Sequence, residues 1–161
     1  MTTSWADVAA AAPELGAKVQ ARFEKTGLGY LATLRKDGAP RISGLEPLFW
    51  DAHLWLGMMD ASRKQADVER DPRFALHAAN IDKQVGEGDA RVSGRAVRVT
   101  DNDTFAAFRA AFHEKTDQEP PPAFPLYTVD VTELMHLMPA GDHLLIEWWT
   151  PEGGLQIKQR Y

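Results

Sequence analysis

Short runs of β-forming residues, separated by tight-turn signals, make up most of this chain and limit its possible folds more than any other feature. The clearest pair is Tyr30–Leu34 and Pro40–Leu45, which flank the sequence Lys36-Asp37-Gly38. An Asp-Gly pair between two β-like runs is the strongest short-range signal of a hairpin. Strands joined by so short a turn run antiparallel, so we expect an antiparallel sheet.

The remaining β-like runs supply enough strands to close, or nearly close, a barrel. Pro47–Trp50 is expected to continue the second strand after a bulge around Gly44. Further strands are predicted at His53–Met58, Phe74–Ala79, Ala90–Thr100, Leu126–Val131, Glu133–Met138 and His143–Thr150, with a last short strand at Leu155–Tyr161. This number of antiparallel strands is typical of a mainly-β or α+β barrel.

Helical periodicity marks three segments, Glu14–Lys25, Ser62–Arg70 and Asp103–Lys115. The last carries three phenylalanines at i, i+3 and i+7, which form one apolar stripe. The helices alternate with the predicted strands along the chain, so we expect them to lie around the periphery of the barrel.

The composition excludes several classes of function. The 161 residues fit a single domain over residues 1–161, and the absence of cysteine rules out disulfides, thiolate nucleophiles and cysteine-ligated metals. A net charge of −5 argues against a general nucleic-acid binder. The sequence has no apolar run of the length that a transmembrane helix needs and no signal-peptide pattern at its start. We therefore expect a cytoplasmic protein with neither nucleic acid nor membrane as partner.

The sequence Ser62-Arg63-Lys64 is the strongest candidate for a binding site. Ser62 is a favourable N-cap for the helix that follows, and a helix N-terminus offers unpaired N–H groups and a positive dipole end. Basic residues usually avoid that end, so two of them beside a hydroxyl predict a concentrated anion site. The alternative is that Arg63 and Lys64 are ordinary solvated surface charges.

Arg41 is a second candidate for the same kind of site. Ser43 lies two residues further along the predicted strand and therefore on the same face. A serine and an arginine on one sheet face could bind an anion together. The alternative is a polar outer face of a half-solvated sheet.

Other chemical motifs are missing from the sequence. None of the five histidines is spaced as a metal ligand, so no metal site is predicted. There is no Gly-x-Ser-x-Gly nucleophile elbow, and Gly86-Glu87-Gly88 lacks the context of a dinucleotide fingerprint. The adjacent Trp148 and Trp149 lie on a predicted strand, where neighbours point to opposite faces, so one is expected in a core and the other against a partner or ligand.

Taken together, several segments resemble the pyridoxamine 5′-phosphate oxidase-like family of flavin-binding split barrels. They are the stretch from Gly29 to Arg41 (GYLATLRKDGAPR), the Ser62-Arg63-Lys64 sequence and the stretch from Asp71 to Leu76 (DPRFAL). Their order and spacing over residues 25–100 carry the resemblance, and residues 124–160 are similar more loosely. The resemblance implies a six-stranded antiparallel split β-barrel with peripheral helices, which forms a homodimer with two cofactors in grooves between the subunits.

The resemblance also implies roles for individual residues. Ser62, Arg63, Lys64 and Arg41 would bind the phosphate of FMN, with Ser43 beside Arg41. The backbone of Gly57, Met58 and Met59 would run along the isoalloxazine ring. Trp148 or Trp149 of the other subunit would pack on the cofactor. These roles are those of an oxidoreductase that transfers hydride to or from a small organic substrate; no catalytic side chain is identified.

The sequence departs from true pyridoxamine-phosphate oxidases at two places. Glu46 stands where they carry a substrate-binding lysine, and their C-terminal Arg-x-His motif has no match, so vitamin B6 oxidation is not implied. Two alternatives remain on the same fold. One is a reductase that uses the deazaflavin coenzyme F-420, whose acidic tail Arg91, Arg95 and Arg98 could bind. The other is a non-catalytic flavin-, haem- or bilin-binding module.

Overall fold

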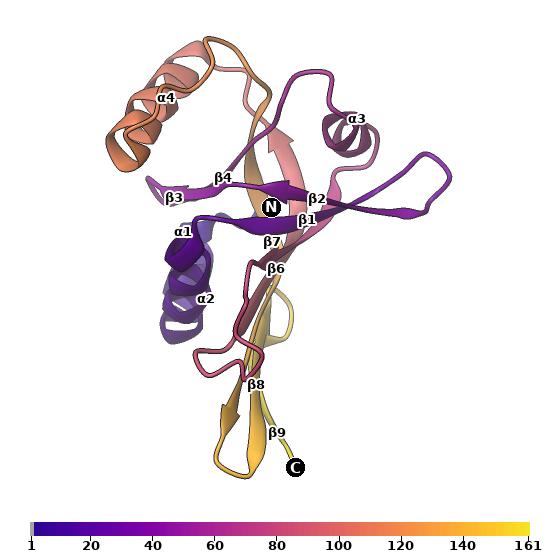
Figure 1. The fold of residues 1–161 in the computed structure, drawn as a ribbon, viewed down its shortest axis with the longest axis vertical. Helices are drawn as coiled ribbons and strands as arrows, with labels where there is room; N and C mark the ends of the chain where they lie inside the picture. The colour runs from indigo at the N-terminus through magenta and orange to yellow at the C-terminus, as the bar shows by residue number, and fades with distance from the viewer. Residues whose placement is uncertain (1) are drawn as a thin grey trace.

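The computed structural model describes residues 2–161 (Figure 1). The helices are α1 (Trp5–Ala11), α2 (Pro13–Thr26), α3 (Arg63–Arg70) and α4 (Asn102–Thr116). The strands are β1 (Gly29–Leu34), β2 (Pro40–Leu45), β3 (Pro47–Trp50), β4 (His53–Gly57), β5 (Arg73–Ala78), β6 (Asp89–Arg98), β7 (Leu126–Ala140), β8 (His143–Thr150) and β9 (Gly154–Arg160).

The strands form one antiparallel sheet that curls into a split barrel. Seven of them are hydrogen-bonded in the order β2-β1-β5-β6-β7-β4-β3, and β8 and β9 add to the side of β7. The two ends of this order, β2 and β3, are separated by Glu46 alone. The sheet must therefore curl until its ends meet, although β2 and β3 do not pair with each other. Counting β2 and β3 as halves of one interrupted strand gives the six-stranded split barrel, so the predicted fold class is confirmed.

The interruption does not lie where the sequence suggested. Gly44 pairs regularly with Tyr30 in the β1–β2 ladder, so the bulge predicted at Gly44 is wrong and the break occurs at Glu46. A second correction concerns residues 126–140, which form a single strand rather than two. Ser93 pairs with Glu133 while Gly94 pairs with Val131, which leaves Thr132 as the extra residue of a β-bulge.

This bulge explains why the sequence suggested two strands. Val129 and Val131 are buried before it, whereas Leu134 and His136 are buried after it. An extra residue in a strand shifts the period-two alternation by one position, and a shifted alternation looks like the end of one strand and the start of another.

Helix α1 was not predicted. Its start is fixed by a capping box, in which Ser4 Oγ accepts from the Asp7 N–H and the Asp7 carboxylate accepts from the Ser4 N–H. Trp5 is buried, and its ring lies 4.7 Å from that of Phe49 in β3. The other three helices match their predicted bounds to within one residue at each end.

The core has two parts, separated by the sheet. The main cluster fills the barrel beneath α1 and α2, and it includes Leu54 and Leu56 of β4. Trp55 points the other way into a smaller cluster under α4, where its ring lies 5.3 Å from that of Phe108. Residues of β4 therefore alternate between two apolar environments, and the phenylalanine stripe of α4 is the cover of the second.

The distal half of β7 continues with β8 and β9 into an arm that extends away from the helices and carries the C-terminus (Figure 1). Trp149 of β8 is buried in the main core, whereas Trp148 faces the opposite side of the sheet and is half-buried. The opposite orientations predicted for these two tryptophans are confirmed. Among the helices of residues 2–161, none has the length and apolar character needed to span a membrane.

Candidate functional site

Ser62 caps α3, as predicted. Its Oγ accepts a hydrogen bond of 3.3 Å from the Gln65 N–H, and its backbone is extended. The preceding Ala61 has a φ of +55°, a left-handed conformation that turns the chain abruptly into the helix. Arg63 is consequently the first residue of α3, where the backbone N–H groups have no intrahelical partners.

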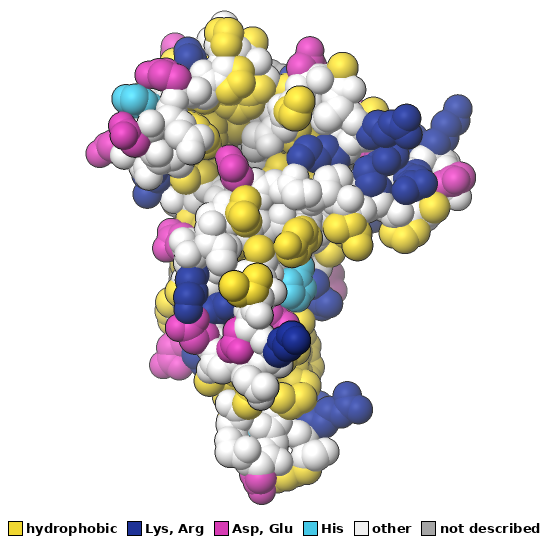
Figure 2. All heavy atoms as spheres, in the orientation of Figure 1, with side chains coloured by type: hydrophobic (Ala, Val, Ile, Leu, Met, Phe, Trp, Pro, Cys, Tyr) yellow, Lys and Arg dark blue, Asp and Glu magenta, His cyan; other side chains and the backbone are white. Residues whose placement is uncertain are grey.

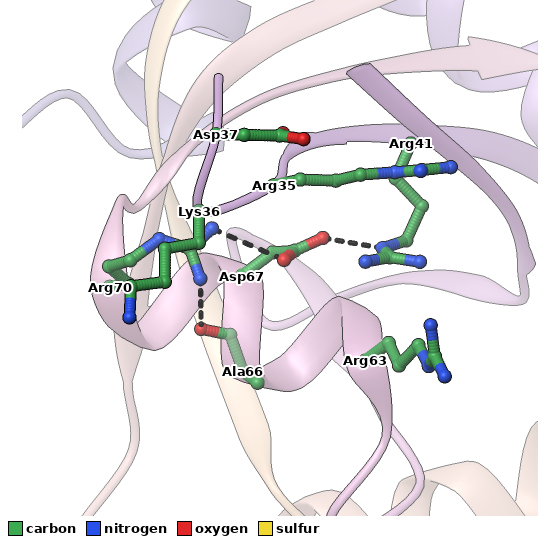
Figure 3. Close-up of a pocket in the computed structure, with 8 residues that line it drawn as sticks. All are labelled: Arg35, Lys36, Asp37, Arg41, Arg63, Ala66, Asp67 and Arg70. Atoms are coloured by element: carbon green, nitrogen blue, oxygen red, sulfur yellow. Dashed lines mark hydrogen bonds and ion pairs between the residues drawn. The ribbon is translucent and has the colours of Figure 1, made fainter. Parts of the chain in front are cut away.

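A cavity of about 550 Å³ lies between this helix and the β1–β2 hairpin (Figure 3). Its lining contains five cationic side chains and two carboxylates, a surplus of three positive charges in a chain whose net charge is −5. The lining residues are Arg35, Lys36, Asp37, Arg41, Arg63, Ala66, Asp67 and Arg70. A hollow with this charge is suited to an anionic group.

The spacing of residues on α3 builds one wall of the cavity. Arg63, Asp67 and Arg70 are separated by four and three positions, so they share one face of the helix. Arg41 of β2 faces them across the hollow (Figure 3). The hairpin turn after β1 supplies the remaining cations, Arg35 and Lys36.

Asp67 holds the arginines in place from below. Its buried carboxylate accepts hydrogen bonds from Arg41 Nε at 2.6 Å, from Thr33 Oγ1 at 2.8 Å and from Arg70 Nη2 at 3.2 Å. Burial alone would raise the pKa of Asp67, but the hydrogen bonds from Arg41, Thr33 and Arg70 outweigh it and lower that pKa below its ordinary value. The ionised Asp67 therefore fixes Arg41 without cancelling the positive charge of the cavity.

The other cations of the cavity are available to a ligand. Within residues 2–161, Arg35, Lys36 and Arg63 take part in no ion pair with a carboxylate. Figure 2 shows Lys and Arg side chains gathered over the β1–β2 hairpin and α3. Arginine binds phosphate oxygens through two parallel N–H groups, so this unpaired set is well suited to a phosphate.

Lys64 lies beside the cavity rather than in its lining. Its Nζ donates a 2.7 Å hydrogen bond to the carbonyl oxygen of Gly44 in β2, which ties the start of α3 to the sheet. Burial lowers the pKa of Lys64, and the nearby Glu46 carboxylate acts in the opposite direction. Ser43 lies on β2 two residues beyond Arg41 and is half-buried, also outside the lining.

Comparison with protein families gives a match over residues 15–137 to the model described as pyridoxamine 5′-phosphate oxidase. The match covers well over half of the chain and includes α3 and every residue of the cavity. The chain belongs to the pyridoxamine 5′-phosphate oxidase family. No curated protein sequence matches it significantly.

Solved structures of the same family share the fold. An FMN-binding, pyridoxamine 5′-phosphate oxidase-related protein of Nostoc punctiforme aligns with a TM-score of 0.64 and 13% identity, over 93% of this chain and 96% of the other. PhzG of Burkholderia lata, solved with tetrahydrophenazine-1-carboxylic acid, aligns with a TM-score of 0.64 and 14% identity, over 96% of this chain and 94% of the other. The haem storage protein HutZ of Vibrio cholerae aligns with a TM-score of 0.60 and 16% identity, over 75% of this chain and 89% of the other.

The remaining candidates from the family resemblance lie outside the cavity lining. Gly57 ends β4 with the ring of Phe124 beside it, and the Met58 N–H donates to the carbonyl of Pro125 at 2.9 Å. Met58 is buried and Met59 is 77% exposed. Of the two tryptophans, Trp148 alone faces the exposed side of the sheet.

Four lining residues that matter here were not among the candidates from sequence, namely Arg35, Lys36, Asp67 and Arg70. The repeat of Arg63, Asp67 and Arg70 at helical spacing was a usable signal, as were the basic residues at the predicted hairpin turn. The proposed extension through Arg91, Arg95 and Arg98 is not part of the cavity. Arg91 is paired with Glu133, and Arg98 with Glu69.

Proposed function

We propose that this protein is a flavin-dependent oxidoreductase that binds FMN at the interface of a homodimer and transfers hydride to or from a small organic substrate. The observation that carries the proposal is the cationic cavity at the start of α3, with Arg63 unpaired and Arg41 held by Asp67. The FMN-binding relative of Nostoc punctiforme and PhzG of Burkholderia lata support it at the level of the fold.

The residues of the cavity fit the phosphate of a flavin. A phosphate monoester carries about −1.5 to −2 charges near neutral pH, which the surplus of three positive charges can balance. Arg63 and Arg41 would bind its oxygens, with Ser62 setting the helix start and Lys64 adding charge beside it. The bound flavin would supply the hydride chemistry. The chain itself would bind and orient the cofactor, and no side chain is assigned as a catalytic acid or base.

The exposed face of the sheet supports the homodimer. Five residues form a single cross-strand row over β1, β5, β6, β7 and β8: Tyr30, His77, Arg91, Met135 and Trp148. Tyr30 is 52% exposed, and Ile42 on the neighbouring β2 is 73% exposed. This face is open and carries apolar and aromatic side chains beside His77 and Arg91, a mixture that is typical of an interface. We propose a second copy of this chain as its partner, which would bring Trp148 of each arm to the other subunit.

Arg35 and Lys36 favour a second candidate, the deazaflavin coenzyme F-420. These two residues lie on the exposed hairpin turn, at the outer side of the cavity, and no carboxylate pairs with them within residues 2–161. They are available for the additional carboxylates of that coenzyme's acidic tail. This candidate keeps Arg41 and Arg63 as the phosphate site and changes only the hydride carrier.

Absorption spectroscopy distinguishes these candidates. The purified protein is titrated with FMN and separately with the deazaflavin, alongside Arg63→Ala/Lys64→Ala and Arg35→Ala/Lys36→Ala. FMN binding that the first variant loses and the second keeps supports the FMN proposal. Deazaflavin binding that both variants lose supports the second candidate. Binding of neither, together with haem binding by the folded protein, contradicts both and favours a haem module like HutZ.

A further inference from the structure

A second cavity lies on the other side of the fold, beside α2. Its volume is about 370 Å³, and it is formed by α2, the loop before β6 and the distal part of β7. Its lining residues are Lys18, Ala21, Arg22, Lys25, Glu87, His136 and Met138, none of which lines the cavity at α3. The proposed function uses none of them.

Three cations of α2 point toward this cavity. Lys18, Arg22 and Lys25 are spaced by four and three positions, so they share one face of the helix. Arg22 Nη1 lies 2.7 Å from Glu87 Oε2, and Lys25 pairs with the same carboxylate. Lys18 pairs with the buried Glu147 at 2.7 Å. Three cations thus share these two carboxylates, and the Asp82 carboxylate also lies within electrostatic range of Arg22 and Lys25.

Two buried polar atoms in the lining have no hydrogen-bond partner. They are Nε of Arg22, whose side chain is 8% exposed, and Nδ1 of His136, which is 2% exposed. The nearest carboxylate oxygen to Nδ1 belongs to Glu147 at 3.7 Å, beyond hydrogen-bond distance. Buried polar groups in proteins are nearly always paired with protein, water or ligand. Two unpaired atoms in one cavity therefore point to a bound group.

The backbone fixes the imidazole of His136 in this place. Gly88 has a φ of +85°, and a Cβ there would lie 2.2 Å from His136 Nε2 and 2.9 Å from the carbonyl oxygen of Leu137. Position 88 is thus restricted to glycine by space as well as by conformation. Burial lowers the pKa of His136 and outweighs a hydrogen bond from the ring to the Glu87 backbone, so the ring is neutral. Because Nδ1 has no partner, Nε2 makes that bond, and Nδ1 is an acceptor.

We propose that this cavity binds a phosphate group, held by Arg22 Nε and Lys25 and contacted by His136 Nδ1. Hydrogen phosphate and phosphate monoesters carry unprotonated oxygens that can accept hydrogen bonds from the two cations. When singly protonated, they also carry a hydroxyl that can donate a hydrogen bond to the neutral imidazole. Glu87 is 60% exposed at the rim and bonded to the same two cations. The Glu87 carboxylate would therefore compete with phosphate for these two cations, and we expect it to bind them more weakly than phosphate does.

Isothermal titration calorimetry with inorganic phosphate tests the proposal. The titrations use Arg63→Ala/Lys64→Ala protein to weaken phosphate binding at α3, and variants of the α2 cavity then assign the binding that remains. One phosphate is expected to bind, Lys25→Met to weaken it about tenfold and Glu87→Gln to tighten it several-fold. The control is Lys83→Met, which removes the same charge from an exposed residue outside the lining and should leave binding unchanged.

A second measurement follows the imidazole itself. The ¹⁵N shifts of His136 are expected to move on addition of phosphate, in step with the calorimetric binding curve. Phenyl phosphate in place of inorganic phosphate distinguishes the source. Equal affinities indicate a site for the phosphate group alone, and tighter binding of the ester indicates an organic phosphate. Absence of binding, or binding that Lys25→Met and Glu87→Gln leave unchanged while the His136 shifts stay fixed, overturns the proposal.

Discussion

Arg41 Nε lies 2.6 Å from Oδ2 of Asp67, and this ion pair joins β2 to α3 beneath the cationic cavity. The two residues are 26 positions apart. Thr33 of β1 donates to the same oxygen at 2.8 Å, so three elements meet at one buried carboxylate. Removing Asp67 should therefore affect both the stability of the barrel edge and the geometry of the site.

Asp67→Asn is expected to lower the free energy of unfolding at neutral pH by about 2–3 kcal/mol, because it removes a charged acceptor from buried donors. The pKa of Asp67 is lowered in the folded protein from its ordinary 3.8. Its stabilisation is therefore fully present above pH 3.8 and is lost as the pH falls through the folded-state value. Urea unfolding at neutral and acidic pH should show the difference between the two proteins shrinking in acid.

Asp71→Asn is the matched control for that measurement. Asp71 pairs with Arg73 at 2.6 Å, but the Arg73 side chain is 62% exposed. An exposed pair of this kind contributes little to stability, because solvent screens it. If Asp71→Asn cost as much stability as Asp67→Asn, the special role given to the buried carboxylate would be wrong.

Arg63→Ala is expected to weaken FMN binding by about 10- to 100-fold, the loss of one charge-assisted hydrogen-bonding group. The thermal midpoint should hardly change, because Arg63 is exposed and takes part in no ion pair within residues 2–161. Arg95→Ala removes an exposed arginine that lies outside the cavity and should leave the affinity unchanged. Fluorescence titration of FMN measures both. Equal losses in the two variants would indicate a general charge effect.

Gly88→Ala is expected to destabilise the fold by about 3 kcal/mol or more, since the new methyl group must displace the buried ring of His136. Gly38→Ala is an informative partner. Its φ of +83° is nearly the same, but a Cβ there would meet nothing within 4 Å. Gly38→Ala should lower the free energy of unfolding only by the cost of a positive φ in a residue with a side chain, about 1 kcal/mol. Thermal unfolding of both variants separates steric from conformational cost, and similar losses would contradict the contact with His136.

His136 should make stability depend on pH in the mildly acidic range. Its pKa is lowered from 6.5 mainly by burial, which outweighs the opposing effects of a hydrogen bond to the Glu87 backbone and of the Glu147 carboxylate. Stability is therefore full above about pH 6.5 and declines as the pH falls, by up to about 1.4 kcal/mol per pH unit. His136→Asn should flatten that decline, as followed by urea unfolding between pH 8 and 5. The control His113→Asn, which replaces an exposed histidine, should leave that decline unchanged.

Ile42→Lys is expected to convert the protein to a monomer, because it replaces an exposed apolar side chain of the proposed interface with a charge. Ile81→Lys is the control, since Ile81 is 99% exposed in the loop after β5 and lies outside the row that includes Tyr30 and Trp148. Size-exclusion chromatography with light scattering gives the mass of each. A dimer that persists in Ile42→Lys would place the interface elsewhere.

Local signals in the sequence predicted local structure well. The Asp-Gly pair correctly predicted the β1–β2 hairpin, and Ser62 correctly predicted the start of α3. Both predictions succeeded because turns and caps depend on residues within a few positions of each other. Helix α1 was missed despite the Ser4–Asp7 capping box, because its alanine-rich sequence has no clear apolar stripe. The bulge at Thr132 was taken for a break between strands, since a pattern shift is all that a sequence shows of it.

The candidate site was predictable in part for the same reason. Arg41 and Arg63 could be found because each lies beside a recognisable turn or cap, and the cavity brings them together. The role of Asp67 could not be found, because its partners Arg41 and Thr33 are 26 and 34 positions away. Only the curling of the sheet, which brings β1 and β2 under α3, makes those contacts.

The most direct test compares the affinities of FMN and riboflavin, which differ only in the phosphate, for the wild-type protein and for Arg63→Ala/Lys64→Ala. If the cavity at α3 binds the cofactor phosphate, the wild-type protein should prefer FMN by about 100-fold or more, and the variant should lose most of that preference while keeping its riboflavin affinity. Equal binding of FMN and riboflavin by the wild-type protein, or an undiminished preference in the variant, would contradict the account.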